Sequence, residues 1–430
     1  MGKDNERCLF VAHDGGSQIG GVHTWLETLI PMLRDRGLKC STALFLRNGE
    51  GFLTHQLRQS GIDVSTCSHF DPFLDRVRWL KGVIEKTQAN VVIPNYLVAG
   101  FAATMGLRAK GVRTVAVLHS DDPFYRALIE CQRSNDSALT FDYAIPVSCF
   151  LEGVVHERLG KDFPSTRIPC GIVLNNNIAS PASVEFRLVY VGRLVQEQKR
   201  ICDLAAAFCR VVREIPGVTA DIIGDGDDRK AVEAVLVANG SPRQVRLLGA
   251  LTPVEVRQQL SQYHAKVLLS DYEGLPVALL EAMASGLVPI CMTMRSGINE
   301  LVVDRKTGLI VADREAGFVS AVRELVQNPS LWSALSKRAR EQVQEFDAER
   351  CAARWVKVIN GIANIQAAAT PAPNFKRMSF PQWRPEFEWD MQRGQSHSAQ
   401  WSPFEQLVGN LRGRLGSYRR KIFKSRSIRK

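Results

Sequence analysis

One stretch of the sequence, residues 270–286, constrains the fold more than any other. It follows a short apolar run typical of a buried strand, and it starts a helix near Pro276 that ends at Gly286. A buried strand followed by a turn and a helix is the repeating unit of an open parallel sheet, which binds ligands at the carboxyl ends of its strands. Glu273 lies in the turn and Glu281 lies about one turn into the helix, so we expect both carboxylates to face one cleft.

The start of this helix is a predicted anion site. Gly274, Leu275, Pro276 and Val277 stand where the helix leaves backbone amides without an internal partner. The helix dipole at that end favours a negative group such as a diphosphate. Two glutamates beside an amphipathic helix would otherwise be an ordinary solvated face.

The two glutamates bracket Gly-Leu-Pro and an apolar helix that closes with Glu-Ala-Met-Ala-Ser-Gly. This combination resembles the E-x7-E signature of retaining glycosyltransferases of the GT-B fold, of the family four type (glycosyl transferases group 1). The resemblance implies that Glu281 holds the ribose of a nucleotide-diphosphate sugar and that Glu273 holds hydroxyls of the transferred sugar. It covers roughly residues 5–365 and is strongest over residues 188–310.

A basic element precedes this stretch in the sequence. Leu188-Val-Tyr-Val-Gly-Arg193-Leu is typical of a strand and turn, and Lys199 follows just before a predicted helix over residues 201–214. Arg supplies a planar fork and Lys a point charge, so Arg193 and Lys199 can grip one diphosphate. The pair resembles the G-R-L…K element of the same family. The D-x-D at Asp225 and Asp227 is interpreted as a glycine-rich turn rather than a metal site.

The first part of the chain contains a glycine-rich turn and a histidine at strand ends. Gly20 and Gly21 lie between a predicted strand and a helix, where backbone amides can approach a phosphate. By the resemblance, these glycines lie against the donor diphosphate. His119 follows the predicted strand at residues 114–118, and the resemblance places it near the donor sugar. Without the resemblance, a lone histidine is more often structural.

Short β-branched runs alternate with helical segments through the chain, which predicts parallel sheets. We expect an α/β fold of two doubly wound Rossmann-like domains that face a central cleft, followed by a basic C-terminal extension. Residues 1–180 are predicted to form an acceptor-side domain and residues 181–345 a nucleotide-sugar-binding domain. Residues 346–366 are expected to form a closing helix that returns to the first domain, and residues 367–430 a basic aromatic tail.

Composition separates this tail from the body. The chain has 430 residues and a net charge of +11, and residues 371–430 hold thirteen Lys/Arg against four acids. Nine of the eleven net charges therefore lie in the tail, which is also rich in Trp and Phe. Such a segment can dock on an anionic membrane surface or can be a disordered, solubilising extension. Ten cysteines without a C-x-x-C pair suggest neither zinc nor a disulfide framework, and no signal peptide or membrane span is recognised.

The combined prediction is a retaining, metal-independent glycosyltransferase without a cofactor, located in the cytoplasm or peripherally on the inner membrane face. It would move a sugar from a UDP- or GDP-sugar to a saccharide or lipid-linked acceptor, in cell-surface polysaccharide or glycolipid synthesis. Two alternatives stay open. One is a catalytically silent sugar-nucleotide binder or scaffold of a polysaccharide assembly complex. The other is a nucleic-acid binder through the tail, which we do not expect.

Overall fold

The computed structural model describes residues 6–15, 19–133, 139–174, 176–241, 243–294 and 296–362. The predicted basic tail, residues 367–430, lies outside the described residues, as does the end of the predicted closing helix beyond residue 362. Among the described residues, no helix is long and apolar enough to cross a membrane.

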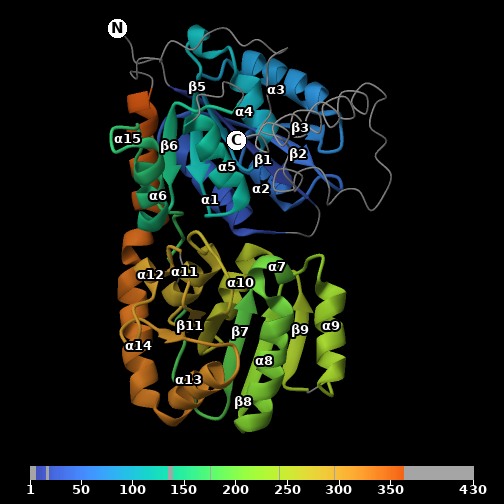
Figure 1. The fold of residues 1–430 in the computed structure, drawn as a ribbon, viewed down its shortest axis with the longest axis vertical. Helices are drawn as coiled ribbons and strands as arrows, with labels where there is room; N and C mark the ends of the chain where they lie inside the picture. Colours follow the sequence, from blue (N-terminus) through green and yellow to red (C-terminus); the bar gives the residue numbers. More distant parts are fainter. Residues whose placement is uncertain are drawn as a thin grey trace, which may run out of the picture. The chain divides into compact units, whose positions relative to one another are not determined.

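The first domain is built on a parallel sheet of six strands (Figure 1). Their spatial order is β3-β2-β1-β4-β5-β6. The strands are β1 (Arg7–Asp14), β2 (Lys39–Leu46), β3 (Asp63–Ser68), β4 (Val91–Pro94), β5 (Arg113–Leu118) and β6 (Tyr143–Pro146). β4 and β5 are buried throughout, as expected for strands covered by helices on both faces.

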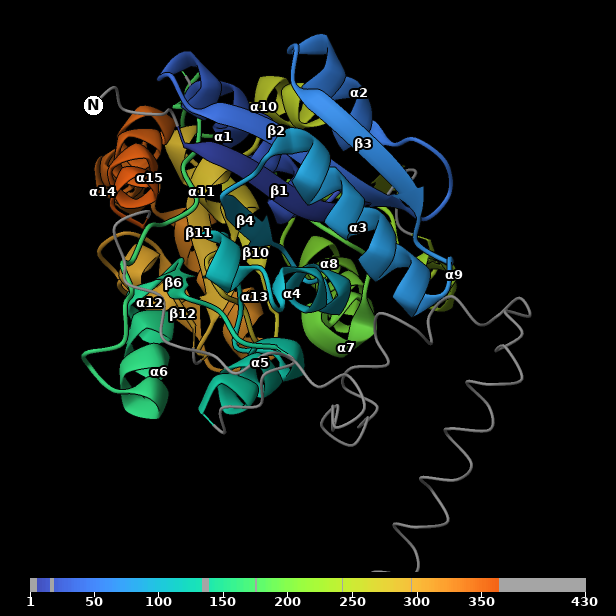
Figure 2. The ribbon, with the colours of Figure 1, turned by 90° about the horizontal axis from the view of Figure 1, so that it is seen from above.

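Helices cover both faces of this sheet (Figure 2). α1 (Gly21–Asp35) and α2 (Phe52–Gln59) lie on one face, and α3 (Phe73–Thr87) and α4 (Val98–Thr104) lie on the other. The short helix η1 (Arg108–Lys110), α5 (Pro123–Arg133) and α6 (Cys149–Leu159) complete the domain. The chain changes face between β3 and β4, so the strand order reverses between the neighbours β1 and β4. The carboxyl ends of those two strands are therefore the first domain's ligand-binding position.

The second domain repeats this arrangement with the order β12-β11-β10-β7-β8-β9. Its strands are β7 (Phe186–Val191), β8 (Val218–Ile223), β9 (Val245–Gly249), β10 (Ala265–Leu268), β11 (Val288–Met292) and β12 (Leu309–Val311). Its helices are α7 (Gln196–Lys199), α8 (Ile201–Glu214), α9 (Arg229–Ala238), α10 (Pro253–Leu260), α11 (Val277–Ala284), α12 (Ile298–Leu301), α13 (Ala316–Gln327) and α14 (Pro329–Gln342). Here the order reverses between β7 and β10, so these two strand ends are the equivalent position.

The last described helix, α15 (Ala348–Ile362), follows the 3₁₀ turn η2 (Val343–Phe346) and packs against α1 of the first domain (Figure 1). Its apolar face carries Trp355, whose ring centroid lies 5.8 Å from that of Trp25 and 6.2 Å from that of Phe10. Backbone hydrogen bonds join its first residue to the first domain, because Ala348 N donates to Ile172 O at 2.9 Å. Burial of these large aromatic rings stabilises the helix in this position.

The predicted fold class is confirmed, because both domains are doubly wound parallel α/β sheets. The predicted helix over residues 201–214 coincides with α8. The edge strand β3, whose residues are all polar or only partly buried, was not predicted from the sequence. The limits of the domains themselves stay a prediction.

Candidate active site

The basic element with Arg193 and Lys199 meets the stretch that carries Glu273. They meet where the strand order of the second sheet reverses. Arg193 follows β7, and Glu273 follows its neighbour β10. Lys199 ends α7, the short helix that leaves the β7 turn. The topology thus brings residues 74 positions apart in the chain to one strand edge.

Lys199 and Glu273 form a bidentate ion pair at this edge. The Lys199 Nζ donates to Glu273 Oε1 at 2.6 Å and to Oε2 at 2.8 Å. The Lys199 side chain is only 14% exposed and that of Glu273 only 5% exposed. Burying either charge alone would be costly, so each stabilises the other in this position.

Gln198 fixes the geometry of the pair and links it to Arg193. Its side-chain amide donates to Tyr272 O at 3.1 Å, and its Oε1 accepts from Arg193 Nη2 at 3.2 Å. Its backbone carbonyl accepts from Asp271 N at 3.0 Å. Gln198 therefore joins the segment that carries Lys199 to the segment that carries Glu273, through both its side chain and its backbone.

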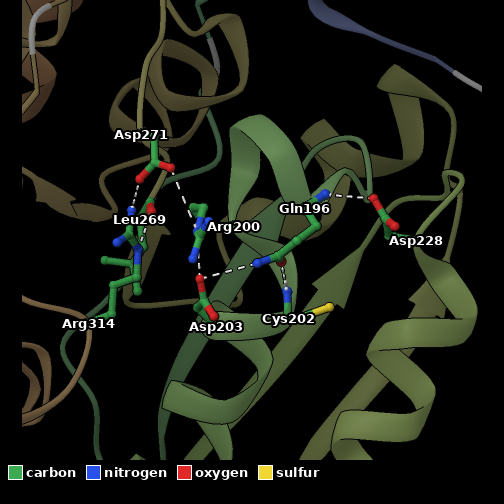
Figure 3. A network of polar contacts seen from close by, with 8 residues as sticks. All are labelled: Gln196, Arg200, Cys202, Asp203, Asp228, Leu269, Asp271 and Arg314. Carbon is green, nitrogen blue, oxygen red and sulfur yellow. Dashed lines mark hydrogen bonds and ion pairs between the residues drawn. The ribbon is translucent and has the colours of Figure 1, made fainter.

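A wider polar network continues from Asp271 (Figure 3). Arg314 donates from Nε to Leu269 O at 2.9 Å and also pairs with Asp271. Arg200 reaches the same Asp271 at 3.7 Å and Asp203 at 2.6 Å, so it joins the start of α8 to the end of β10. Arg200 adopts a left-handed backbone conformation, with a φ of 52°. Few non-glycine residues do so, and here the turn between α7 and α8 requires it.

The start of α11 lies beside the glycine-rich turn of the first domain. The helix begins at Val277, and its N-cap Pro276 has no amide hydrogen, so the amide donors of this terminus are those that follow Pro276. A Cβ on Gly21 would lie 3.4 Å from Val277 Cγ2, and a Cβ on Gly20 would lie 3.9 Å from Arg193 Cδ. These are ordinary van der Waals distances, so they place the first-domain turn in contact with Val277 and beside Arg193.

His23 holds this turn. Its Nδ1 accepts from Gly20 N at 3.0 Å, and its Nε2 lies 3.1 Å from His13 O, which makes Nε2 the protonated nitrogen. Burial lowers the pKa of His23 to about 4, which keeps the ring neutral and preserves both hydrogen bonds near neutral pH.

Glu281 lies inside α11 and is buried. Burial raises its pKa to about 7, and Arg257 of α10, whose Nη1 lies 3.5 Å from its Oε1, acts in the opposite direction. Glu27 of α1 faces the same arginine from the first domain, and burial also raises the pKa of Glu27. Glu281 thus sits in a three-residue charged cluster that spans both domains.

His119 lies at the carboxyl end of β5 with its imidazole buried. Its Nε2 is 3.0 Å from Asn95 Oδ1, while the Asn95 amide donates to Val11 O and Ile93 O. Because both donors of Asn95 are used, its oxygen faces His119, and His119 Nε2 must be the donor. Burial lowers the pKa of His119 to about 3, so the ring is neutral and its Nδ1 is a hydrogen-bond acceptor.

The loop between Glu273 and α11 touches the first domain directly. A Cβ on Gly274 would lie 1.6 Å from His119 O, closer than any side chain can approach a backbone oxygen. On the other side, Gly297 N donates to Gly274 O at 2.8 Å. Glycine at position 274 is therefore what allows Glu273 and His119 to belong to one site.

The D-x-D sequence has a structural explanation. Asp225 Oδ1 accepts from the amide of Gly226, and a Cβ on Gly226 would lie 2.5 Å from Leu194 O. The glycine lets this turn pack against the turn of Arg193. Among the residues that the structure describes, no group of three or more His, Cys, Asp or Glu side chains is arranged to hold a metal ion.

Residues 185–328 match the family described as glycosyl transferases group 1. This match covers about a third of the chain. The glycogen synthase of Mycobacterium tuberculosis is 31% identical over 191 residues, which are 44% of this chain and 44% of that protein. The putative colanic acid biosynthesis glycosyltransferase WcaL of Escherichia coli K12 is 28% identical over 289 residues, 60% of this chain and 66% of that protein. The chain thus matches less than two thirds of the length of either relative.

Solved structures show the same fold over most of the chain. The pneumococcal O-GlcNAc transferase GtfA, solved with UDP and GlcNAc, has a TM-score of 0.67 at 14% identity, covering 84% of this chain and 100% of that one. Anabaena Alr3699/HepE, solved with UDP and glucose, has a TM-score of 0.67 at 17% identity, covering 83% and 99%. The fold of the chain is therefore GT-B.

Sequence reasoning missed several residues in and around this candidate site. Asn95 follows β4 as a polar residue at a strand's carboxyl end, a signal that could have found it. Gln198 carries no sequence signal, because its role depends on two loops that meet only in the fold. Lys266 was included in an apolar run and proves to be fully buried within β10.

The contact at Gly274 gives the first prediction. Gly274→Ala should destabilise the protein by about 1–3 kcal/mol, the range for an overpacked buried position, because the new methyl group must push the loop away from His119. Gly82→Ala in α3 is the control, since its Cβ would meet nothing within 4 Å and alanine favours a helix. Urea unfolding of both variants measures the effect. Equal stability of the Gly274→Ala variant and the wild type would show that the two domains do not pack as described.

Proposed function

We propose that this chain is a retaining, metal-independent glycosyltransferase that uses a nucleotide-diphosphate sugar. The observation that carries the proposal is the buried Lys199–Glu273 pair beside Arg193, at the point where the strand order reverses. A diphosphate needs fixed positive charge, and the transferred sugar needs a carboxylate near its anomeric carbon. This arrangement supplies both within one hydrogen-bonded unit.

The leaving diphosphate is the group that such a site must stabilise. Arg193 and Lys199 provide two cations, and the start of α11 adds amide donors aimed in one direction. Because Gln198 and Glu273 already hold these cations in place, they need not reorganise when charge develops. In this proposal they perform the function that a metal ion performs in other phosphate chemistry.

The sugar would lie between Glu273 and His119. Cleavage of the bond to the diphosphate leaves positive charge on the anomeric carbon, and the Glu273 carboxylate would stabilise it. His119 is neutral and presents an acceptor nitrogen, so it would accept a hydrogen bond from a sugar hydroxyl. Glu281 would accept hydrogen bonds from the ribose hydroxyls of the nucleotide. These would replace its present contact with Arg257.

The nature of the donor and acceptor is supported by the relatives. GtfA and HepE were solved with UDP, and WcaL is named for colanic acid biosynthesis. We therefore propose a UDP- or GDP-sugar as donor, a saccharide or lipid-linked acceptor, and a role in polysaccharide or glycolipid synthesis. The competing function is a silent sugar-nucleotide binder or scaffold, which would bind the donor without turnover.

Donor binding without metal is the direct test. At least one of UDP-glucose, GDP-mannose and ADP-glucose should raise the melting temperature of the protein in the presence of EDTA, by mass action. Arg193→Ala should lose that stabilisation, and Mn²⁺ should not restore it. Stabilisation that appears only with Mn²⁺ would contradict the metal-independent site, and binding without any transfer to saccharide acceptors would favour the scaffold.

The two glutamates should separate binding from chemistry. Glu281→Ala should weaken binding of the nucleoside diphosphate itself, because it removes the ribose contact. Glu273→Gln should leave that binding nearly intact and lower transfer roughly 10²-fold or more, the scale of losing one preorganised contact to the transition state. Calorimetric titration and initial rates on both variants measure this. Equal losses of nucleotide affinity would refute the division of roles.

The basic tail is proposed to hold the enzyme on the cytoplasmic face of a membrane, near a lipid-linked acceptor. This rests on the sequence alone, since residues 371–430 lie outside the described residues. Each basic residue near an anionic bilayer contributes on the order of 1 kcal/mol, and aromatic side chains can insert beside them.

Truncation after residue 370 tests the tail. The shortened chain should keep its nucleotide affinity and lose salt-sensitive co-sedimentation with phosphatidylserine-containing vesicles. The full-length chain with neutral phosphatidylcholine vesicles is the control. If the truncated chain binds anionic vesicles as well as the full chain, the membrane contact lies outside the tail.

A further inference from the structure

A lysine is buried directly below the candidate active site. Lys266 lies in β10, one of the two strands whose ends carry the site, and it has no exposed surface. Its neighbours along this strand are apolar and buried as well. A fully buried amine is costly unless its partners compensate, so a functional reason for its presence is worth seeking.

The side chain runs toward the carboxyl end of the sheet and ends below the turn that carries Arg193. Its Nζ donates to Val191 O at 3.0 Å, the last residue of β7, and lies 4.7 Å from the centroid of the Tyr190 ring. The Tyr190 hydroxyl in turn donates to Arg193 O at 2.8 Å. Lys266 and Tyr190 thus hold the two ends of the turn from Val191 to Arg193.

Most of the groups that act on this amine belong to the site itself. They are Lys199 at the end of α7, Glu273 in the loop, Glu281 in α11 and Cys291 in β11. Burial is the largest influence and lowers the pKa of Lys266 to about 7, with the charge on Lys199 acting in the same direction. The two glutamates and the cysteine oppose this shift. Without a bound anion, the amine therefore changes its charge near neutral pH.

We propose that Lys266 is a positioning residue of the donor site, a buried amine that takes up a proton when a diphosphate binds above it. The inference rests on the proposed function. An added negative charge favours the protonated amine. A protonated amine donates a stronger hydrogen bond to Val191 O and makes the electrostatic potential beside Arg193 more positive. Donor affinity and protonation of Lys266 are thus linked, and affinity falls as the pH rises above neutrality.

The free protein gives a test that needs no donor. Between pH 7 and the ordinary lysine pKa of 10.5, the unfolded chain holds a proton that the folded chain lacks, so folding stability rises with pH in this window. Lys266→Met removes that dependence and also removes the cost of burying an amine. The unfolding equilibrium constant of the wild type relative to the variant should fall about tenfold per pH unit there. A lysine with an ordinary role in stability would instead leave the Lys266→Met variant less stable at pH 7, with a parallel pH profile, which would overturn the proposal.

The donor complex gives the second test. Calorimetric titration with UDP-glucose, GDP-mannose and ADP-glucose near pH 8, in Tris and in Hepes, measures proton uptake, because the heat of protonation differs between buffers. These sugar diesters have no group of their own that titrates near neutral pH. The wild type should take up a fraction of a proton on binding, and Lys266→Met should take up less and bind about tenfold more weakly near pH 7. Glu281 also titrates near pH 7, so only the difference between wild type and variant is assigned to Lys266.

Two further variants sharpen the result. Lys266→Gln keeps a donor for Val191 O but cannot gain a proton, so it should lose the proton uptake like Lys266→Met. Lys337→Met is the matched control, because it removes one lysine whose side chain is 79% exposed on α14 and should change neither measurement. Full donor affinity in Lys266→Gln, or unchanged uptake in either Lys266 variant, would overturn the proposal. A wild type that binds none of the three nucleotide sugars would instead refute the proposed function, and the unfolding titration would still decide how Lys266 titrates.

Discussion

The candidate site depends on one interaction, the buried ion pair between Lys199 and Glu273. Neither charge could be held away from water without the other, and the pair forms only because β7 and β10 are neighbours in the sheet. Gln198 and the network around Asp271 keep the two loops in register. The result is a preorganised charge arrangement, the feature from which electrostatic catalysis of diphosphate departure would follow.

Burial acts on several groups around this pair, with opposite consequences for acids and bases. It lowers the pKa of His119 to about 3 and that of Lys266 to about 7, and it raises the pKa of Glu281 to about 7. His119 is thereby fixed as a neutral acceptor, whereas Lys266 and Glu281 have pKa values near neutral pH. The same desolvation thus keeps His119 in one protonation state and brings the pKa values of Lys266 and Glu281 close to neutral pH.

Contacts between the domains complete the site. Gly274 lies against His119 O, and Gly21 lies against Val277, so backbone atoms of one domain meet backbone or side-chain atoms of the other without an intervening side chain. Glu300 of α12 accepts hydrogen bonds from the amides of Cys149 and Phe150 at the start of α6. A carboxylate at a helix start is favourable, so this contact also stabilises the pairing of the two domains.

The sequence by itself determined the two-domain parallel α/β fold, because strand–turn–helix periodicity is a local property. It also singled out Arg193, Lys199, Glu273 and Glu281 as candidate site residues. It did not determine β3, whose polar residues become a strand only by pairing with β2. It also did not determine the roles of Asn95, Gln198 and Lys266, whose partners lie far away in the chain. Those roles depend on strand order and on burial. Only tertiary structure sets these two quantities, since they arise when distant segments exclude water from one place.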